Sequence, residues 1–234
     1  MEGMGQNLKE KEKMKHEFQY ISKNDPEIKE KYQNILDFLH DVQNEVREYF
    51  TFRYDIVGSY KRNMITYDTK SNVGYDFDFN IEVNDDECNY EAYEIKEYII
   101  KAMKKYMYQY ELNKIENSTR VITVKSVSWL NARVIYSCDF AIVNNYEDQN
   151  GKRRQQYIRF NKENQTYSWC EQPEGFYKLP EKINWIKKND LWDEVREKYL
   201  LKKNTNNDPD AHSRSIYALT INEVCQQNGY FWRR

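Results

Sequence analysis

Three aspartates stand in two apolar, strand-like segments of this chain. Asp76 and Asp78 lie within residues 75–83, and Asp139 lies within residues 136–143. Successive side chains of a strand point to opposite faces, so Asp76 and Asp78 leave the same face while aromatic and aliphatic residues fill the other. Carboxylates so close together are costly unless a cation lies between them. Because hard oxygen ligands suit Mg²⁺ and Mn²⁺, the three aspartates predict a metal site.

The order of these acidic segments and of an earlier Gly-Ser pair resembles the DNA polymerase β-type nucleotidyltransferase superfamily. The family pattern is Gly-Ser, then Asp-x-Asp on the next strand, then one Asp on a later strand, matched here by Gly58 and Ser59, by Asp76 and Asp78, and by Asp139. The resemblance implies that Gly58 lets the backbone approach a triphosphate closely and that Ser59 donates to a phosphate oxygen. It also implies that Asp76 and Asp78 bridge two metal ions. Asp139 then binds the ion that lowers the pKa of the attacking hydroxyl.

The Gly-Ser pair, the Asp-x-Asp motif and the later Asp differ in how specifically each indicates a nucleotidyltransferase. Asp-x-Asp alone is weak evidence, because acidic residues flanked by aromatics also occur at sheet edges, and Gly-Ser alone is weaker. All three in this order and strand context favour a nucleotidyltransferase. The family often has a second Gly-Thr or Gly-Ser pair a few residues after the first, where this chain has Asn63 and Met64. Asn63 and the turn at residues 71–74 are candidates for the polar contacts that such a pair would supply.

Length and composition are typical of a compact intracellular enzyme. A chain of 234 residues can form one domain or two packed lobes. Charged residues make up 32% of it, but the net charge is −2, so no global field attracts nucleic acid. We expect a cytoplasmic protein, because no apolar run is long enough to cross a bilayer and the amino terminus lacks a signal-peptide core. The widely spaced cysteines predict buried free thiols rather than a zinc or redox pair; they are Cys88, Cys138, Cys170 and Cys225.

The elements that must position the aspartates are a mixture of helices and strands. Residues 1–24 are polar and lysine-rich with weak helical spacing, whereas apolar residues recur every three to four positions over 26–50 and 90–110 and predict two helices. In the second helix a stripe from Tyr93 to Met107 favours core packing over a ligand site. Alternating segments predict strands at 52–58, 75–83, 120–128, 131–144, 157–160 and 167–170, with a tight turn near Leu130 and Asn131.

The carboxy-terminal third carries a second resemblance. Helices are predicted over 180–188, 191–199 and 213–224. The last two resemble the helical lobe of 2′-5′ oligoadenylate synthases, cyclic GMP-AMP synthases and related terminal transferases. In that lobe a lysine contacts the triphosphate, and a Tyr at the start of a helix that reads Tyr-Ala-Leu stacks on the donor base. The resemblance therefore implies nucleotide-binding roles for Lys202 or Lys203, Ser215 and Tyr217. Tyr217 also has the helical spacing of a core residue, and both alternatives stay open.

Residues 145–156 form a polar segment with a basic tip. The tip consists of Lys152, Arg153 and Arg154. A solvated hairpin turn is the favoured interpretation. The alternative is contact with the phosphates of an acceptor or a growing product.

Together the two resemblances imply an α/β (α+β) fold. It consists of a nucleotidyltransferase core, whose mixed sheet carries the three aspartates, and a C-terminal helical lobe. We divide the chain into an N-terminal helical segment at 1–50 that packs on the core, a catalytic core at 51–172 and a helical lobe at 173–234.

The implied activity is template-independent nucleotidyl transfer that depends on two Mg²⁺ or Mn²⁺ ions. An acceptor hydroxyl attacks the α-phosphorus of a nucleoside triphosphate such as ATP, and pyrophosphate leaves. The nearest resemblance is to enzymes that join nucleotides into short cyclic or linear oligonucleotides, which implies a stress signal or a signal in antiviral defence. One alternative is transfer of a nucleotide to an RNA 3′ end, a protein hydroxyl or a small molecule such as an antibiotic. Another is an inactive nucleotide-binding or interaction module, against which the intact aspartates argue. No membrane partner is expected.

Overall fold

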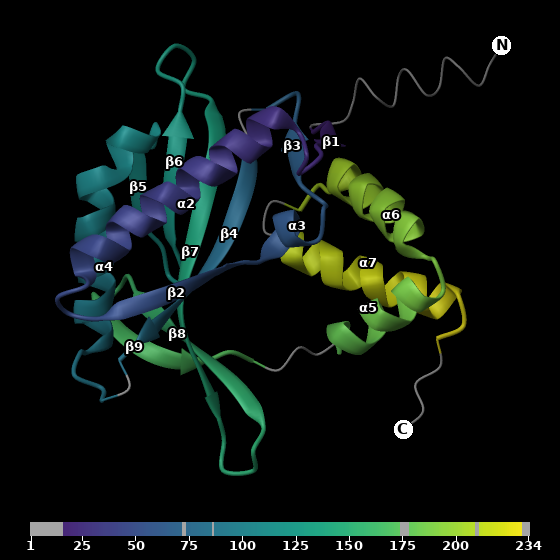
Figure 1. The fold of residues 1–234 in the computed structure, drawn as a ribbon. Coiled ribbons are helices and arrows are strands. Elements are labelled where there is room, and N and C mark those ends of the chain that lie inside the picture. The colour runs from purple at the N-terminus through teal and green to yellow at the C-terminus, as the bar shows by residue number, and fades with distance from the viewer. Residues whose placement is uncertain (1–15, 72–73, 86, 174–177, 209–210, 231–234) are drawn as a thin grey trace. The chain divides into compact units, whose positions relative to one another are not determined.

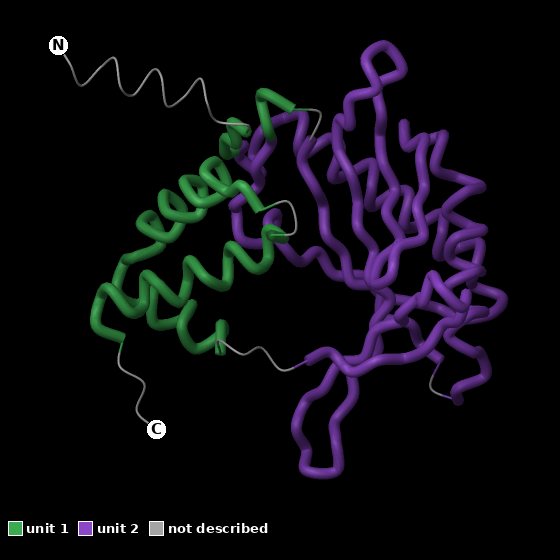
Figure 2. The backbone as a smooth tube through the Cα atoms, turned by 180° about the vertical axis from the view of Figure 1, so that it is seen from behind, with its two compact units in different colours: residues 1–20, 68–71, 174–234 green, residues 21–67, 72–173 purple. Residues whose placement is uncertain are grey.

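The computed structural model describes residues 16–71, 74–85, 87–173, 178–208 and 211–230. The chain divides into two compact units, which Figure 2 colours separately. Unit 1 comprises Met1–Tyr20, Asp68–Ser71 and Glu174–Arg234, and unit 2 comprises Ile21–Tyr67 and Asn72–Pro173. Unit 1 is therefore assembled from three separate stretches of sequence. The division at residues 50 and 172 stays a prediction.

Unit 2 is built on a mixed 7-stranded sheet with the strand order β2-β4-β7-β6-β5, in which β8 pairs with β7 and β9 with β8. The central strands β4 and β7 run parallel, and the other pairs of this sheet are antiparallel. The predicted mixed sheet is confirmed. Its strands are β2 (Thr51–Ile56), β4 (Tyr75–Asn84), β5 (Lys114–Asn117), β6 (Ile122–Val127), β7 (Val134–Glu147), β8 (Arg153–Asn161) and β9 (Thr166–Glu171).

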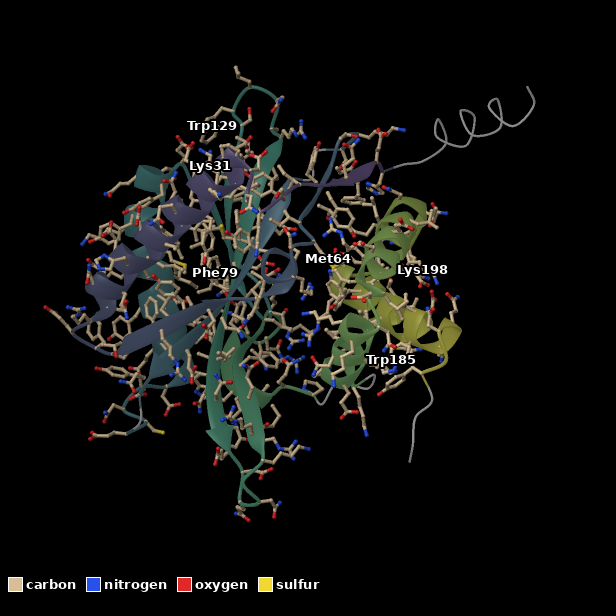
Figure 3. The ribbon with its side chains drawn as sticks, turned by 45° about the vertical axis from the view of Figure 1, so that its right-hand side comes forward. Lys31, Met64, Phe79, Trp129, Trp185 and Lys198 are labelled. Atoms are coloured by element: carbon tan, nitrogen blue, oxygen red, sulfur yellow. The ribbon has the colours of Figure 1, made fainter. Side chains whose placement is uncertain are left out.

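Two helices cover the apolar face of this sheet. They are α2 (Pro26–Val46), which crosses the strands in Figure 1, and α4 (Ala92–Tyr106), which continues as the 3₁₀ helix η1 (Met107–Tyr110). Asp25 begins α2 by accepting a hydrogen bond from the amide of Glu27, and Glu91 and Glu94 form a capping box at the start of α4. Phe79 of β4, labelled in Figure 3, is 1% exposed in the core between helices and sheet.

A short helix, α3 (Gly58–Lys61), follows β2 directly. Tyr60 anchors it, because its ring stacks on Tyr32 of α2 at a centroid distance of 4.4 Å and contacts Phe77 of β4 at 5.5 Å. The amide of Met64 then donates to the carbonyl of Ser59 over 2.9 Å, and the Met64 side chain is buried. Residues 57–64 are thus packed onto the sheet by aromatic and apolar contacts.

Two hairpins extend the sheet. The turn between β6 and β7 carries Trp129 and Leu130, whose side chains are 85% and 99% exposed, and Figure 3 shows Trp129 at this tip. The Asn113 side chain holds the base of the hairpin by bonding both the amide and the carbonyl of Val127. The hairpin between β7 and β8 projects beyond the other strands in Figure 1. Its strands reach further than the sequence predicts, since residues 145–147 and 153–156 also pair.

Unit 1 contains the three helices predicted near the carboxyl terminus. They pack through Ile186, Val195, Tyr199, Ile221 and Val224, all of which are buried. The elements of this unit are β1 (Phe18–Tyr20), α5 (Leu179–Lys188), α6 (Trp192–Thr205) and α7 (Ser213–Gln227), and the chain enters it again at Asp68, the last residue of β3 (Thr66–Asp68).

The separate stretches of unit 1 are joined by polar contacts. The Asn204 side chain of α6 bonds both the amide and the carbonyl of Phe18. The buried Asp68 carboxylate accepts hydrogen bonds from the His16 ring, the Glu17 and Lys70 amides and the Ser71 hydroxyl. Burial alone would raise the pKa of Asp68, but these bonds hold it well below its usual range.

Some details differ from the sequence-based expectation. Tyr93 does not join the core, because it lies in the first turn of α4 at the margin of the buried stripe and is 56% exposed. Cys138 and Cys225 are buried as expected, but Cys88 is exposed and Cys170 is half-buried. Residues 1–15, for which weak helical spacing is expected, and part of the turn at 71–74 lie outside the residues that the structure describes. Within the part of the chain that the structure describes, none of the helices has the length and apolarity needed to span a membrane.

Candidate active site

The three predicted aspartates lie on the polar face of β4 and β7. Asp78 and Asp139 are direct partners in the parallel register, and Asp76 stands opposite Ser137. The intervening residues of both strands, including Phe77 and Cys138, are buried on the other face. Asp76 is exposed, whereas Asp78 and Asp139 are half-buried. The alternation of each strand and the pairing of the two strands therefore place three carboxylates side by side on one open surface.

Neighbouring hydroxyls hold the two outer carboxylates. The Ser137 hydroxyl donates to Oδ1 of Asp76 in a close contact across β4 and β7. The Thr123 hydroxyl on β6 donates to Oδ1 of Asp139 over 2.6 Å, and these two residues are partners in the antiparallel register. A hydrogen bond to an ionised carboxylate is stronger than one between neutral groups, so these contacts fix the orientation of both side chains.

The Gly-Ser element lies directly against the central carboxylate. Gly58 has a φ of +63°, and a Cβ atom placed on it would lie 1.8 Å from Oδ2 of Asp78. The backbone amide of Ser59 donates to the same carboxylate, and the amide of Val57 donates to the Asp78 carbonyl over 2.8 Å. Glycine is therefore required here both for its backbone conformation and for its lack of a side chain.

Burial, and then the charge of a neighbouring aspartate, raises the pKa of Asp78 and of Asp139. Burial and then the charge of Asp139 raise the pKa of Asp78, while the Arg62 charge opposes this. Burial raises the pKa of Asp139 as well, and the Asp76 charge adds to it, against the Thr123 hydrogen bond and the positive charge of Lys125. The site thus carries a local excess of negative charge that a bound cation would relieve.

The donor set fits Mg²⁺ or Mn²⁺, because all three groups are carboxylates on the same face of neighbouring strands. Among the residues that the structure describes, no three His, Cys, Asp or Glu side chains converge as a ready-made metal site. Mg²⁺ usually binds through one or two carboxylates together with waters and substrate phosphates. The arrangement suits that mode of binding.

Sequence reasoning missed four residues of this surface. Thr123 and Ser137 attract no attention in a sequence, since Thr and Ser are ordinary residues of a half-buried strand. Arg62 follows the Gly-Ser pair by three residues, and that spacing was the one available signal for a cation near Asp78. Lys125 becomes apparent only from pairing, because it lies opposite Ser137 and forms a 2.9 Å ion pair with Glu116 of β5.

The predicted nucleotide-binding residues of the helical lobe all belong to unit 1. Lys202 forms a 2.9 Å ion pair with Glu223, and the Lys203 ammonium lies 3.9 Å from the centre of the Phe18 ring. Ser215 is exposed in the first turn of α7. Tyr217 is only 4% exposed and packs edge-to-face against Tyr199 at 6.2 Å. This environment favours the core interpretation of Tyr217, and the binding roles stay predictions.

The basic tip of the β7–β8 hairpin is organised around Asp148. Its carboxylate accepts from the amides of Asn150 and Lys152 and forms a 2.9 Å ion pair with Arg154. Arg154 is therefore already engaged within the turn, which agrees with a solvated hairpin. Contact of Lys152 and Arg153 with phosphates stays a prediction.

The known proteins that resemble this chain do so in structure. No protein-family model matches the sequence, and no curated protein matches it. A crystal structure of Vibrio cholerae DncV in its 3′-deoxy ATP bound form aligns with a TM-score of 0.54 and 14% identity over 86% of this chain and 52% of that one. A second DncV structure, named a cyclic AMP-GMP synthase in complex with the linear intermediate 5′ pppA(3′,5′)pG, aligns with a TM-score of 0.51 and 11% identity, covering 83% and 53% of the two chains.

These similarities concern the fold. The chain spans about half the length of the DncV chains that it matches. Within that span it shares their architecture, so the predicted resemblance in fold to cyclic oligonucleotide synthases of the nucleotidyltransferase type is confirmed.

Proposed function

We propose that this chain is a metal-dependent, template-independent nucleotidyltransferase that joins nucleotides from nucleoside triphosphates into a short cyclic or linear oligonucleotide. One observation carries the proposal: Asp76, Asp78 and Asp139 stand side by side on the polar face of β4 and β7 with the Gly58 backbone against Asp78. Three carboxylates on one face of two neighbouring strands, beside a close backbone approach, suit triphosphate chemistry, and a merely structural sheet gains nothing from them.

Asp76, Asp78 and Asp139 are the residues that would hold two Mg²⁺ or Mn²⁺ ions. Bound there, such ions would neutralise charge on the triphosphate and would lower the pKa of the acceptor hydroxyl. Gly58 would let the backbone approach the triphosphate closely, and the Ser59 hydroxyl would donate to a phosphate oxygen, while the Ser59 amide stays bonded to Asp78. Arg62, whose charge already acts on Asp78, adds positive charge on the same side. The acceptor oxygen bonds to the α-phosphorus, the bond to pyrophosphate breaks, and the hydroxyl proton passes to solvent.

Free nucleotides are proposed as both donor and acceptor. The structural similarity to a DncV complex that holds a linear dinucleotide intermediate supports this choice. Lys202 or Lys203 and Ser215 are proposed to bind nucleotide, whereas the buried Tyr217 is assigned to the core of the helical unit. The product is proposed to act as a defence or stress signal in the cytoplasm.

The test needs only the purified chain, each nucleoside triphosphate and Mg²⁺ or Mn²⁺. Liquid chromatography with mass spectrometry is expected to show pyrophosphate together with a short oligonucleotide. The double variant Asp76→Asn and Asp78→Asn should form neither. Ordinary activity in that variant would show that the site is misassigned.

The same assay separates the competing functions. Pyrophosphate release that begins only after RNA, protein or an antibiotic is added would favour transfer to one of those acceptors. Nucleotide binding without any pyrophosphate under all of these conditions would favour an inactive binding module.

A further inference from the structure

Two neutral hydroxyls lie beside the outer carboxylates of the candidate active site. Thr123 and Ser137 are 8% and 9% exposed, and each donates to Oδ1 of one aspartate on the adjacent strand. Both lie within paired strands, with at least one further residue pair on either side of the contact. Asp78, between them, is held differently, by the amide of Ser59.

A neutral donor has a specific advantage at this position. A hydrogen bond to one oxygen fixes the plane of the carboxylate and leaves the other oxygen as a ligand. A lysine or arginine would also fix it, but its charge would repel an incoming metal ion. The nearest ammonium on β6, that of Lys125, is paired with Glu116 at 2.9 Å, which reduces its effect on the site. Hydroxyls orient the aspartates without adding positive charge.

We propose that Thr123 and Ser137 are positioning residues that set the metal affinity of Asp139 and Asp76. The inference rests on the proposed function, in which the carboxylates hold two ions. It assigns different effects to the two hydroxyls. Thr123 would act through Asp139, which in the proposed function would serve one ion, whereas Ser137 would act through Asp76, which would serve both.

Thr123→Val is the informative substitution. Valine keeps the branched shape and the volume of threonine and removes only the hydroxyl, so strand formation is preserved. Thr123→Ser keeps the hydroxyl and removes the methyl group, and it should restore metal binding. Ser126→Ala is the matched control, because Ser126 is 5% exposed on the same strand and lies on its opposite, apolar face.

The experiment is a Mn²⁺ titration of the full chain, followed by electron paramagnetic resonance, in the presence of a non-hydrolysable ATP analogue. The unmodified chain is expected to bind two ions. Thr123→Val should weaken one of them about 10–100-fold, the usual effect of removing a residue that orients a ligand, and Ser137→Ala should weaken both. Ser126→Ala should bind as the unmodified chain does. Thermal melts of each variant confirm folding, and Ser137→Ala decides the question should Thr123→Val fail to fold.

The outcomes separate this inference from the proposed function. Two ions bound with unchanged affinities in both hydroxyl variants would overturn the positioning role alone. No Mn²⁺ bound to the unmodified chain with nucleotide present would overturn the proposed function, and the positioning role with it. Equal weakening in Thr123→Val and Thr123→Ser would also overturn the role, because it would trace the effect to packing.

Discussion

Gly58 and Asp78 approach so closely that a methyl group on Gly58 would overlap the Asp78 carboxylate, with its carbon 1.8 Å from Oδ2. The atoms around this contact cannot easily move apart. Asp78 is bonded through its backbone carbonyl to Val57, and Tyr60 is stacked on Tyr32 only two residues beyond Gly58. The position of the central carboxylate thus depends on the lack of a side chain at a residue far from it in sequence.

Gly58→Ala is therefore expected to abolish turnover and to lower the melting temperature. Gly151 is the control for stability, because it has a φ of +70° but a Cβ atom placed on it would meet nothing within 4 Å. The free energy of unfolding of Gly151→Ala should fall only by the cost of placing a non-glycine residue in the left-handed conformation, about 1–2 kcal/mol. That of Gly58→Ala should fall by more. Paired thermal melts and a pyrophosphate assay make the comparison. Equal losses of stability would contradict the close contact.

Asp78→Asn should make the chain more stable at pH 7 in the absence of metal. Burial and the Asp139 charge raise the pKa of Asp78 in the folded chain. Protonation of Asp78 therefore stabilises the fold, fully below the pKa that an aspartate has in the unfolded chain. This contribution is lost as the pH rises through the raised pKa of the folded chain. Asparagine removes this penalty. The difference in melting temperature should be largest near neutral pH and should vanish in acid. Melts in EDTA between pH 4 and pH 8 measure it, and a variant less stable than the unmodified chain at pH 7 would contradict it.

Because of Lys96, the free energy of unfolding should depend on pH in the alkaline range. Lys96 is 1% exposed on α4, its ammonium donates to the Ser118 carbonyl over 3.1 Å, and it lies over the rings of Phe160 and Tyr167. Burial lowers the pKa of Lys96 to about 8, with the Glu97 charge opposing this weakly. The folded chain therefore holds the proton less tightly than the unfolded chain does, and stability rises with pH from about 8 to the ordinary pKa of lysine.

Lys96→Met should remove this rise. At pH 7 the variant should be more stable by about 1–2 kcal/mol. Burying the charged Lys96 ammonium costs more free energy than its hydrogen bond to the Ser118 carbonyl contributes. The difference should shrink between pH 7.5 and pH 9.5 in denaturant titrations. A constant difference across that range would show that Lys96 keeps its ordinary pKa.

Tyr217→Ala distinguishes a core residue from a base-stacking one. Since Tyr217 is 4% exposed against Tyr199, truncation should destabilise the chain by about 3–5 kcal/mol. Nucleotide affinity of the protein that remains folded should not change. A normal melting temperature with a raised Michaelis constant would support stacking instead, and Tyr217→Phe should resemble the unmodified chain in either case.

The acidic site was more predictable than its surroundings. The alternation of apolar and acidic residues over 75–83 was sufficient to place Asp76 and Asp78 on one face, because side-chain direction in a strand is a local property. That Asp139 lies beside Asp78 depends on which strands pair, and only its strand-like context and the family resemblance pointed to it. The hydroxyl of Thr123 became visible only in the register of β6 with β7.

Other elements escaped prediction for physical reasons. The strands β1, β3 and β5 have 3, 3 and 4 residues, too few for an alternating pattern to emerge. The ends of β7 and β8 are polar, yet they pair because the ladder uses backbone groups whatever the side chains are. Tyr93 has the spacing of a core residue but lies in the first turn of α4 at the margin of the buried stripe.

The bonds between Phe18 and Asn204 have a consequence for how the chain is made. These residues are 186 positions apart, and both belong to unit 1. During synthesis, which adds residues from the amino terminus, the segment around Phe18 emerges first and must wait for α6 before its backbone groups find these partners. Unit 2 has all of its residues by then. Translation therefore supplies every residue of the sheet-bearing unit before the helical unit can form these two bonds.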